Sequence, residues 1–421
     1  MIETMIEEKK DVRSYLEAAH NIGKHLSREA IWIEDKCNWI GHEVTLVDGQ
    51  HANAVRSCGI EFYSGLSGIA LFLSELYHIT KDPIILHTLE GTLNNIFYNL
   101  ESNNLNNYGY YSGKVGLGFT LWRIGLKLER EELSAKGLEI VKSIKDEALQ
   151  RTEIDIISGA AGAISILLKL YFALNDQEFL DMAKKCGEFL ISIAIEENNT
   201  FSWKTVDDNY ALTGFSHGAS GIAVSLLELY YTTKKEKYWN ASMGGFRFEQ
   251  TWYNEKEQNW PDLREFNGQG TPQCMSMWCH GAPGIAIAHM KAYELTQHDY
   301  FLGMAKVALG TTFKSVLNDI RNNPGMNFSI CHGLAGNSDI LLVGSDVFND
   351  PQYRSAAYSA GDLGIQRYDK TRTIYPSGVN DPSRKTMGQQ ENAGLMLGLS
   401  GTGMFYLRLY NSRAIPSVLI P

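Results

Sequence analysis

The stretch Gly218–Tyr230, GASGIAVSLLELY, contains the pattern that decides the fold, because the chain repeats it. Gly-x-x-Gly followed by an apolar segment occurs seven times, with the first glycine at 65, 113, 159, 218, 281, 333 and 398. In five of these copies a tyrosine lies twelve positions after that glycine. Repeats at intervals of 46 to 65 residues indicate a supersecondary unit that buries its apolar face only against its neighbours.

Each repeat predicts a pair of helices. The segment after the glycines is apolar at helical spacing and too long for a strand, as in Ile222, Val224, Leu226, Leu227, Leu229 and Tyr230. Between two such segments lies a second helical stretch with charges on one side, for example residues 176–197. The sequence therefore predicts one nearly all-apolar helix and one amphipathic helix in every repeat.

Seven such pairs predict an all-α fold, an α/α toroid with the GxxG helices inside and the amphipathic helices outside. An open solenoid is the alternative, but it normally has polar capping repeats, and the first and last copies here are as apolar as the middle ones. We expect a single domain over residues 1–421. An N-terminal helical segment over 1–55 would precede a seven-repeat toroid over 56–421.

Composition restricts the class of function. Lys and Arg number 38 against 48 Asp and Glu, a formal charge of −10, which disfavours a general nucleic-acid or anionic-membrane binder. The start, MIETMIEEKKDVRS, lacks the apolar region of a signal peptide, and no run is as long as a membrane span. We therefore expect a cytoplasmic protein. Six scattered cysteines favour metal binding or a reactive thiol over a disulfide framework.

The residues that precede the glycines carry the candidate chemistry. Glycine lets the crowded N-termini of the inner helices approach one another, so the preceding side chains face a shared cavity at one rim of the ring. Three consecutive repeats have histidine there, at His217, His280 and His332. Two of them add a cysteine one residue earlier, at Cys279 and Cys331. These groups are predicted to converge on one sector of the rim.

This cluster predicts a zinc site. A catalytic Zn²⁺ takes three protein ligands and leaves one position open, and Cys279, Cys331 and one or more of the three rim histidines satisfy that requirement. The alternative is that each buried Cys is a small hydrophobe and each His a core residue with its hydrogen bonds made. Two Cys-His pairs at equivalent positions of adjacent repeats favour the metal. Cys274 is a conceivable fourth ligand, although it has no counterpart in other repeats.

The repeat, taken with SHGASG (216–221), WCHGAPG (278–284) and CHGLAGN (331–337), resembles the lanthionine synthetase C-like cyclase family. CNWIG (37–41), NWPDLRE (259–265) and GLMLGLSGTG (394–403) are most similar to the C-terminal cyclase domain of bifunctional class II lanthipeptide synthetases. Those enzymes carry a dehydratase module ahead of the cyclase, and 421 residues leave no room for one. The resemblance implies a stand-alone cyclase or the cyclase half of a larger or split enzyme.

The resemblance also implies roles for individual residues. The zinc ligands of the family fall on Cys279, Cys331 and His332, the rim histidine proposed as an acid/base falls on His217, and the rim aspartate falls on Asp155. From the residues alone, Asp155 could instead cap the inner helix that starts near 159, because aspartate is a favoured N-cap.

One position departs from the family. Class I members have an arginine four residues before the first zinc cysteine, where this chain has Met275, so that role is missing or served by another residue. Some members have tyrosine directly after that cysteine, where this chain has His280, which makes His280 a candidate proton donor in its place.

The reaction implied by the resemblance is the intramolecular addition of a peptide cysteine to dehydroalanine or dehydrobutyrine, which forms (methyl)lanthionine rings. The implied partners are a dehydrated precursor peptide and a dehydratase, as a domain or as a separate protein. Two thiolates and a neutral imidazole make the zinc site neutral, so a bound substrate thiolate should stay nucleophilic. We expect residues 238–265 and 369–385, the long insertions, to line the peptide groove or to be surface decoration.

Two other classes of function remain open from the sequence. One is a zinc-containing protein that binds thiols or peptides without catalysis. The other is a different α/α-toroid enzyme such as a glycoside hydrolase, which needs paired inward carboxylates; among the rim positions only Asp155 qualifies.

Overall fold

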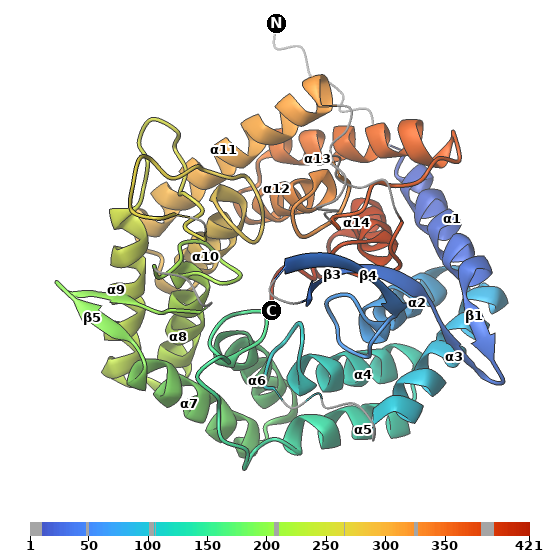
Figure 1. Ribbon diagram of the computed structural model, residues 1–421, viewed down its shortest axis with the longest axis horizontal. Helices are drawn as coiled ribbons and strands as arrows, with labels where there is room; N and C mark the ends of the chain where they lie inside the picture. The colour runs from blue at the N-terminus through green and yellow to red at the C-terminus, as the bar shows by residue number, and fades with distance from the viewer. Residues whose placement is uncertain are drawn as a thin grey trace, which may run out of the picture.

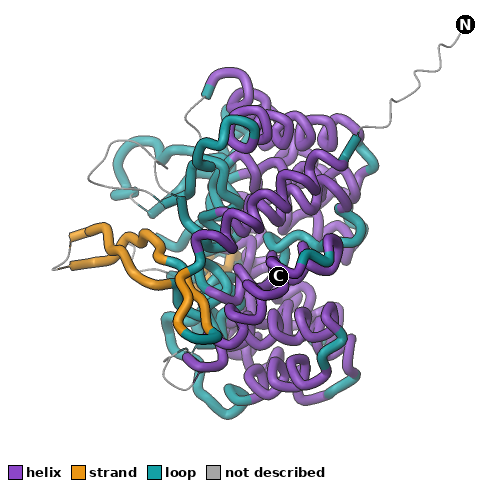
Figure 2. Tube along the Cα trace, turned by 90° about the vertical axis from the view of Figure 1, so that its right-hand side faces the viewer, coloured by secondary structure: helices purple, strands orange, loops and turns teal. Residues whose placement is uncertain are grey.

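The computed structural model describes residues 11–47, 50–100, 105, 107–205, 210–264, 266–323, 327–379 and 391–421. Within these residues the chain forms a closed ring of two concentric layers of helices (Figure 1). Long loops and short hairpins lie on one side of the ring, and short turns lie on the other (Figure 2). The predicted α/α toroid is confirmed.

The inner layer consists of the helices that begin in the GxxG repeats. Each inner helix contacts the next, and the last contacts the first, which closes the ring. The first six are each 15 residues long, so the repeat is regular in structure as well as in sequence. The inner helices are α2 (Leu66–Thr80), α4 (Lys114–Leu128), α6 (Ala160–Leu174), α8 (Ala219–Thr233), α10 (Ala282–Thr296), α12 (Leu334–Phe348) and α14 (Leu399–Asn411).

The outer layer consists of the amphipathic helices. Six of them follow their inner partner after a short turn: α3 (Pro83–Leu100), α5 (Glu131–Lys142), α7 (Gln177–Ser192), α9 (Glu236–Thr251), α11 (Asp299–Asn322) and α13 (Pro351–Gly364), which continues into the π-helical turn η1 (Ile365–Asp369). No helix follows α14, and α1 (Arg13–Glu29) packs on it instead. The first helix of the chain therefore supplies the outer member of the last pair.

The prediction of a separate N-terminal helical segment over 1–55 is wrong in two respects. Among the described residues of this segment only α1 is helical; it is followed by the hairpins β1 (Ile31–Ile33) with β2 (Lys36–Asn38) and β3 (Ile40–Val47) with β4 (Gln50–Ser57). Alternating β-branched and aromatic residues, with a left-handed turn residue at Glu34, favour the first hairpin. Moreover, α1 belongs to the ring, because in the described residues it packs on α14 far more extensively than the outer helix α13 does. A third hairpin pairs β5 (Ile195–Glu197) with β6 (Thr200–Ser202).

The second glycine of every repeat has a common steric reason. A Cβ atom there would lie 1.5 to 2.4 Å from the backbone carbonyl oxygen six residues earlier. In α6, for example, a Cβ on Gly162 would lie 2.1 Å from the oxygen of Ile156. The loop that carries the rim side chains thus packs directly on the first turn of its helix, and only glycine allows this contact.

We expect Gly162→Ala to destabilise the protein by about 1–3 kcal/mol or more, because backbone must move to admit the methyl group. Gly310→Ala, on outer helix α11, is the matched control: nothing lies within 4 Å of its Cβ position, and a change of about 0.5–1 kcal/mol in the stabilising direction is expected. Thermal or urea unfolding measures both. Equal stability of the two variants would contradict the steric explanation.

Candidate metal centre

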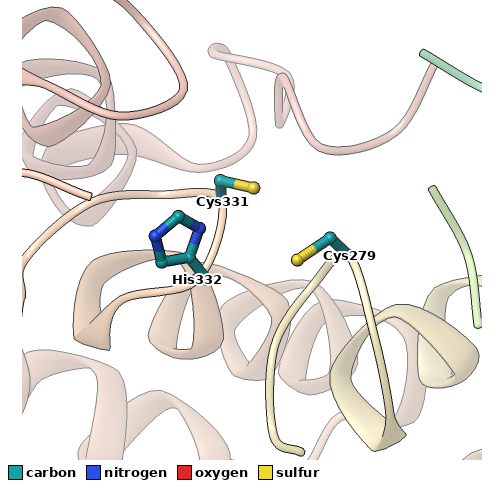
Figure 3. Close-up of side chains that lie close together, drawn as sticks. All are labelled: Cys279, Cys331 and His332. Carbon is teal, nitrogen blue, oxygen red and sulfur yellow. The ribbon is translucent and has the colours of Figure 1, made fainter. Parts of the chain in front are cut away.

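Cys279, Cys331 and His332 form a cluster on the rim. Their ligand atoms all lie within 4.8 Å of one another, and the two sulfur atoms and the imidazole point into one shared space (Figure 3). Cys279 lies in the turn before α10, and the other two lie in the turn before α12. Both cysteine side chains are buried. The structure thus brings together the three residues that the sequence predicted as zinc ligands.

The backbone of both turns is held firmly. The N–H of Met277 donates to the carbonyl of His280 (3.0 Å), and Gly281 follows with φ of 94°, a conformation that favours glycine. In the next repeat the N–H of Cys331 donates to the carbonyl of Met396 (2.9 Å). Each cysteine is therefore placed by hydrogen bonds of its own loop or of a neighbouring repeat.

The imidazole of His332 is oriented for metal binding. Its Nε2–H donates to the carbonyl of Gly378 (2.8 Å), which leaves Nδ1 with its lone pair toward the cysteines. Burial lowers the pKa of His332, but hydrogen bonding to Cys279 and the charge of that thiolate raise it more, so the net shift is upward. Bonds of about 2.3 Å from zinc to sulfur and about 2.0 Å from zinc to nitrogen require ligand atoms less than about 4.5 Å apart. The ligand atoms of Cys279, Cys331 and His332 lie within 4.8 Å of one another, which is close to that limit.

The two thiols share one hydrogen bond and titrate as a pair. The hydrogen bond from Cys331, with smaller contributions from His280 and His332, holds the pKa of Cys279 well below its usual value, although burial opposes this. The pKa of Cys331 is correspondingly raised by its bond to the Cys279 thiolate and by burial. The hydrogen bond thus favours the thiolate of Cys279 over that of Cys331, and a bound divalent cation would favour loss of both protons.

Tyr63 is a site residue that sequence reasoning missed. Its hydroxyl donates to Sγ of Cys331 (3.0 Å) across the ring closure, from the loop before α2. Tyr63 occupies the position two residues before the first glycine, which is also the position of Cys279 and Cys331 in their repeats. Comparison of that position across all repeats could have found it.

His217 and Asp155 form a second pair on the rim. Nδ1 of His217 lies 2.5 Å from Oδ2 of Asp155, whose side chain is 3% exposed. Oδ1 of Asp155 accepts hydrogen bonds from the N–H groups of Ile157 (3.0 Å) and Ser158 (2.8 Å). Burial lowers the pKa of His217, but the hydrogen bond and charge of Asp155 raise it, with a net upward shift.

The alternative role of Asp155 as a helix cap is wrong. The N-cap of α6 is Gly159, and it has no side-chain cap. The carboxylate instead satisfies the turn that precedes the helix with one oxygen and faces His217 with the other. A carboxylate that accepts two backbone N–H bonds is held in one orientation. The turn before α6 therefore fixes the position of the oxygen that faces His217.

His280 lies beside His217 but is placed differently. The two ring centroids are 6.0 Å apart, and the His280 side chain is 1% exposed. Neither of its ring nitrogens has a hydrogen-bond partner among the described residues, and the carboxylate of Asp262 lies 3.7 Å from its Nδ1. Burial lowers the pKa of His280 to about 4. At neutral pH this imidazole is therefore uncharged.

Arg264 brings a cation to the site from the loop between α9 and α10. Asp262 holds the guanidinium through Nε (3.1 Å to both oxygens) and Nη2 (2.6 Å to Oδ2). Burial lowers the pKa of Arg264, but Asp262 and then the charges of Cys279 and Cys331 raise it. Arg264 is therefore a candidate for the role that Met275 does not fill. Arg264 belongs to the NWPDLRE motif (259–265), which in the sequence indicates the family but not this role.

Cys274 and the two long insertions differ in how close they come to the site. Cys274 lies outside the cluster of possible metal ligands found among the described residues. Of the insertion predicted at 238–265, residues up to 251 belong to outer helix α9, and only the loop beyond it approaches the site. The insertion at 369–385 contributes Gly378 to the orientation of His332, while its residues 380–385 lie outside the described part of the chain.

The fold and this rim define a class of protein. The family model described as lanthionine synthetase C-like protein matches residues 58–420, and the chain belongs to that family. In the described part of the chain, no helix has both the length and the apolar character to cross a bilayer.

Two curated relatives and one solved structure are similar to the chain. The lacticin 481/lactococcin biosynthesis protein LcnDR2 of Lactococcus lactis subsp. lactis is 28% identical over 405 residues, which are 92% of this chain but 40% of that protein. The nisin biosynthesis protein NisC of the same organism is 23% identical over 332 residues, 69% of this chain and 75% of that protein. A structure of nisin cyclase, 18% identical, superposes with a TM-score of 0.65 over 84% of this chain and 89% of that one, which shows the shared fold.

Proposed function

We propose that the chain is a zinc-dependent lanthipeptide cyclase, which adds cysteine thiols of a dehydrated precursor peptide to dehydroalanine or dehydrobutyrine and so forms (methyl)lanthionine rings. Membership in the lanthionine synthetase C-like family supports this proposal. The observation that carries it is the presence, on one rim, of a Cys-Cys-His cluster and a separate His-Asp pair. Because the chain spans 40% of LcnDR2, a dehydratase in the same or a partner protein is part of the proposal.

The residues fit a zinc ion. Cys279 and Cys331 would bind it as thiolates and His332 through Nδ1, which leaves a fourth position for the substrate sulfur. When bound, zinc would lower the pKa of the substrate thiol and hold the resulting thiolate in place. The hydroxyl of Tyr63 on Cys331 and the carbonyl of Gly378 on His332 are the groups that orient the ligands.

His217 is the group best suited to move the proton. Addition of sulfur to the dehydro residue makes an enolate, whose α-carbon must then be protonated. With Nδ1 directed to Asp155, Nε2 of His217 remains for the substrate, and the raised pKa favours the protonated form. His280, whose pKa is about 4, is a much weaker candidate for this step. Its uncharged ring lies beside His217.

Arg264 supplies the charge balance in this proposal. The substrate thiolate, a third one beside those of Cys279 and Cys331, and then the enolate both add negative charge to a largely buried site. The guanidinium is already close enough for Cys279 and Cys331 to raise its pKa. Its hydrogen bonds to Asp262 already hold the guanidinium in place, so it would offset that charge without ordering a flexible side chain during the reaction.

Space for the peptide exists beside the His-Asp pair. A cavity of about 740 Å³ opens on the rim and is lined in part by Ser158, Glu153 and Glu147. The hydroxyl of Ser158 also donates to Asp155 (3.1 Å), so one wall of the cavity adjoins the aspartate of the His-Asp pair, while His217 and the metal cluster are not among its lining residues. Its acidic, hydrogen-bonding walls fit the backbone and basic side chains of a peptide better than an apolar ligand.

The test is ring closure itself. The zinc-loaded protein is incubated with a dehydrated peptide that carries one cysteine, and free thiol is counted by alkylation and mass spectrometry, because cyclisation leaves the mass unchanged. We expect loss of free thiol with the protein present and none in its absence. Persistence of the thiol while the peptide binds would instead support a non-catalytic thiol-binding protein.

We expect Asp155→Asn to move the alkaline limb of the pH–rate profile to lower pH. Asp155 raises the pKa of His217, so removal of its charge lowers that pKa. An acid catalyst works below its pKa, and activity is lost as the pH rises through that value; the loss therefore begins earlier in the variant. The measurement is the rate of ring closure against pH at saturating zinc. Asp82→Asn, which affects the comparable His20–Asp82 pair between α1 and α3 (2.7 Å), should leave the profile unchanged.

A further inference from the structure

The segment Ile415–Pro421 runs into the centre of the ring. Figure 1 places the end of the chain there, surrounded by the inner helices. Ile415, Val418 and Leu419 are at most 3% exposed. This segment belongs to no helix or strand, follows α14 directly and has no counterpart in the other repeats. It therefore fills the axis of the toroid with side chains that the repeat does not provide.

One end of this segment is anchored at the base of α12 and α14. Nη1 of Arg408 donates to the carbonyl of Ile415 (2.5 Å), and the hydroxyl of Ser417 donates to Oδ2 of Asp339 (2.5 Å). Arg408 and Asp339 are themselves a buried ion pair, each with 4% of its side chain exposed. A buried pair of charges requires hydrogen bonds for its remaining polar atoms, and the segment supplies them.

The other end reaches the rim beneath the metal cluster. The hydroxyl of Tyr111 donates to the carbonyl of Val418 (2.8 Å), and Nε1–H of Trp278 donates to the carbonyl of Leu419 (3.0 Å). The rings of Tyr111 and Trp278 also contact each other, with centroids 5.2 Å apart. Two consecutive carbonyls of the segment are thus held by rim residues from the second and the fifth repeats.

Each of these two rim residues leads to one cysteine of the cluster. Trp278 directly precedes Cys279 in the chain. Tyr111 packs edge-on against Tyr63 (6.3 Å between centroids), and its carbonyl accepts the N–H of Tyr63 (2.8 Å). Tyr63 in turn donates to Cys331. The segment in the ring centre is therefore linked to both sulfur ligands through one intervening layer of aromatic side chains.

We propose that Ile415–Pro421 is a plug that closes the ring axis below the metal cluster and positions Cys279 and Cys331 through Trp278, Tyr111 and Tyr63. Trp278 and Tyr111 are positioning residues, since neither is itself one of the clustered ligands. The inference rests on the metal centre of the proposed function. It also implies that a peptide reaches the cluster only from the rim side, because the plug occupies the axis.

The test compares two buried tryptophans that each donate one hydrogen bond to a backbone carbonyl. Trp278→Phe removes the bond to the plug, and Trp39→Phe removes the bond from Nε1 of Trp39 to Leu26 on α1 (2.9 Å). Zinc affinity is measured by competition with a chelator, and the thiolate-to-metal absorption band of the cobalt-substituted protein reports ligand geometry. We expect about 10-fold weaker zinc binding and an altered cobalt band for Trp278→Phe alone. Equal affinity and identical spectra of the two variants would overturn the proposal.

A second measurement needs no metal. In the metal-free protein, deletion of residues 415–421 should increase the rate at which iodoacetamide alkylates Cys279, followed by peptide mass spectrometry, several-fold over the intact chain. Trp278→Phe should give a smaller increase and Trp39→Phe none. If the intact protein binds no zinc, the proposed function fails while this measurement still decides the plug. An unchanged alkylation rate in both the deletion and Trp278→Phe would refute it.

Discussion

Cys331→Ala is expected to abolish stable zinc binding and to reduce ring closure by at least about 100-fold. The proposed zinc site has three protein ligands, and loss of even an outer-sphere partner commonly costs about 10- to 100-fold in affinity or activity. Cys331 also shares the hydrogen bond that lowers the pKa of Cys279, so its removal raises the pKa of the remaining cysteine. The variant therefore loses one ligand and weakens a second.

Metal content by elemental analysis and the thiol-counting assay measure the two effects separately. Cys186→Ala and Cys274→Ala are matched controls. Cys186 is buried, like Cys331, but lies in outer helix α7, and Cys274 lies close to Cys279 in sequence yet outside the cluster. Both should keep one zinc per chain. Zinc retained by Cys331→Ala, or lost equally by Cys274→Ala, would show that the ligand set is wrong.

His217→Asn is expected to lower the rate of ring closure by about 10²- to 10⁴-fold, the usual effect of removing a general acid. Zinc content should stay normal, because His217 belongs to the Asp155 pair and not to the ligand cluster. This separation of metal content from rate distinguishes the acid role from a structural one. His280→Asn should have a smaller effect, since His280 is uncharged at neutral pH.

The control for His217→Asn is His20→Asn, which disrupts a His-Asp pair of similar geometry on the outer layer and should leave both zinc and rate unchanged. Single-turnover kinetics measures the rate without interference from product release. If His217→Asn cyclises at the wild-type rate with zinc bound, another group protonates the enolate. If it loses zinc, His217 has a structural role that the contacts at Asp155 do not show.

The sequence by itself predicted the ring and the cluster of possible metal ligands on its rim. Seven copies of GxxG with an apolar tail are a local pattern, and the steric contact of the second glycine with the carbonyl six residues earlier lies within each copy. The two Cys-His pairs stand out because they depart from that pattern at equivalent positions, and the resemblance to the family selects Cys279, Cys331 and His332 among them. Equivalent positions of adjacent repeats must lie side by side, so a periodic sequence predicts proximity without any further knowledge of the fold.

Only the tertiary structure revealed the contacts that the repeat does not predict. The pairing of α1 with α14 and the contacts of Val418 and Leu419 with Tyr111 and Trp278 join the repeats to segments that carry no periodic signal. The bond from Tyr63 to Cys331 across 268 residues joins two equivalent repeat positions, but only closure of the ring brings them together. Arg264 and the plug likewise reach the site from segments that occur once. Such contacts depend on closure of the ring, which brings the first and last repeats together and leaves one axis to be filled.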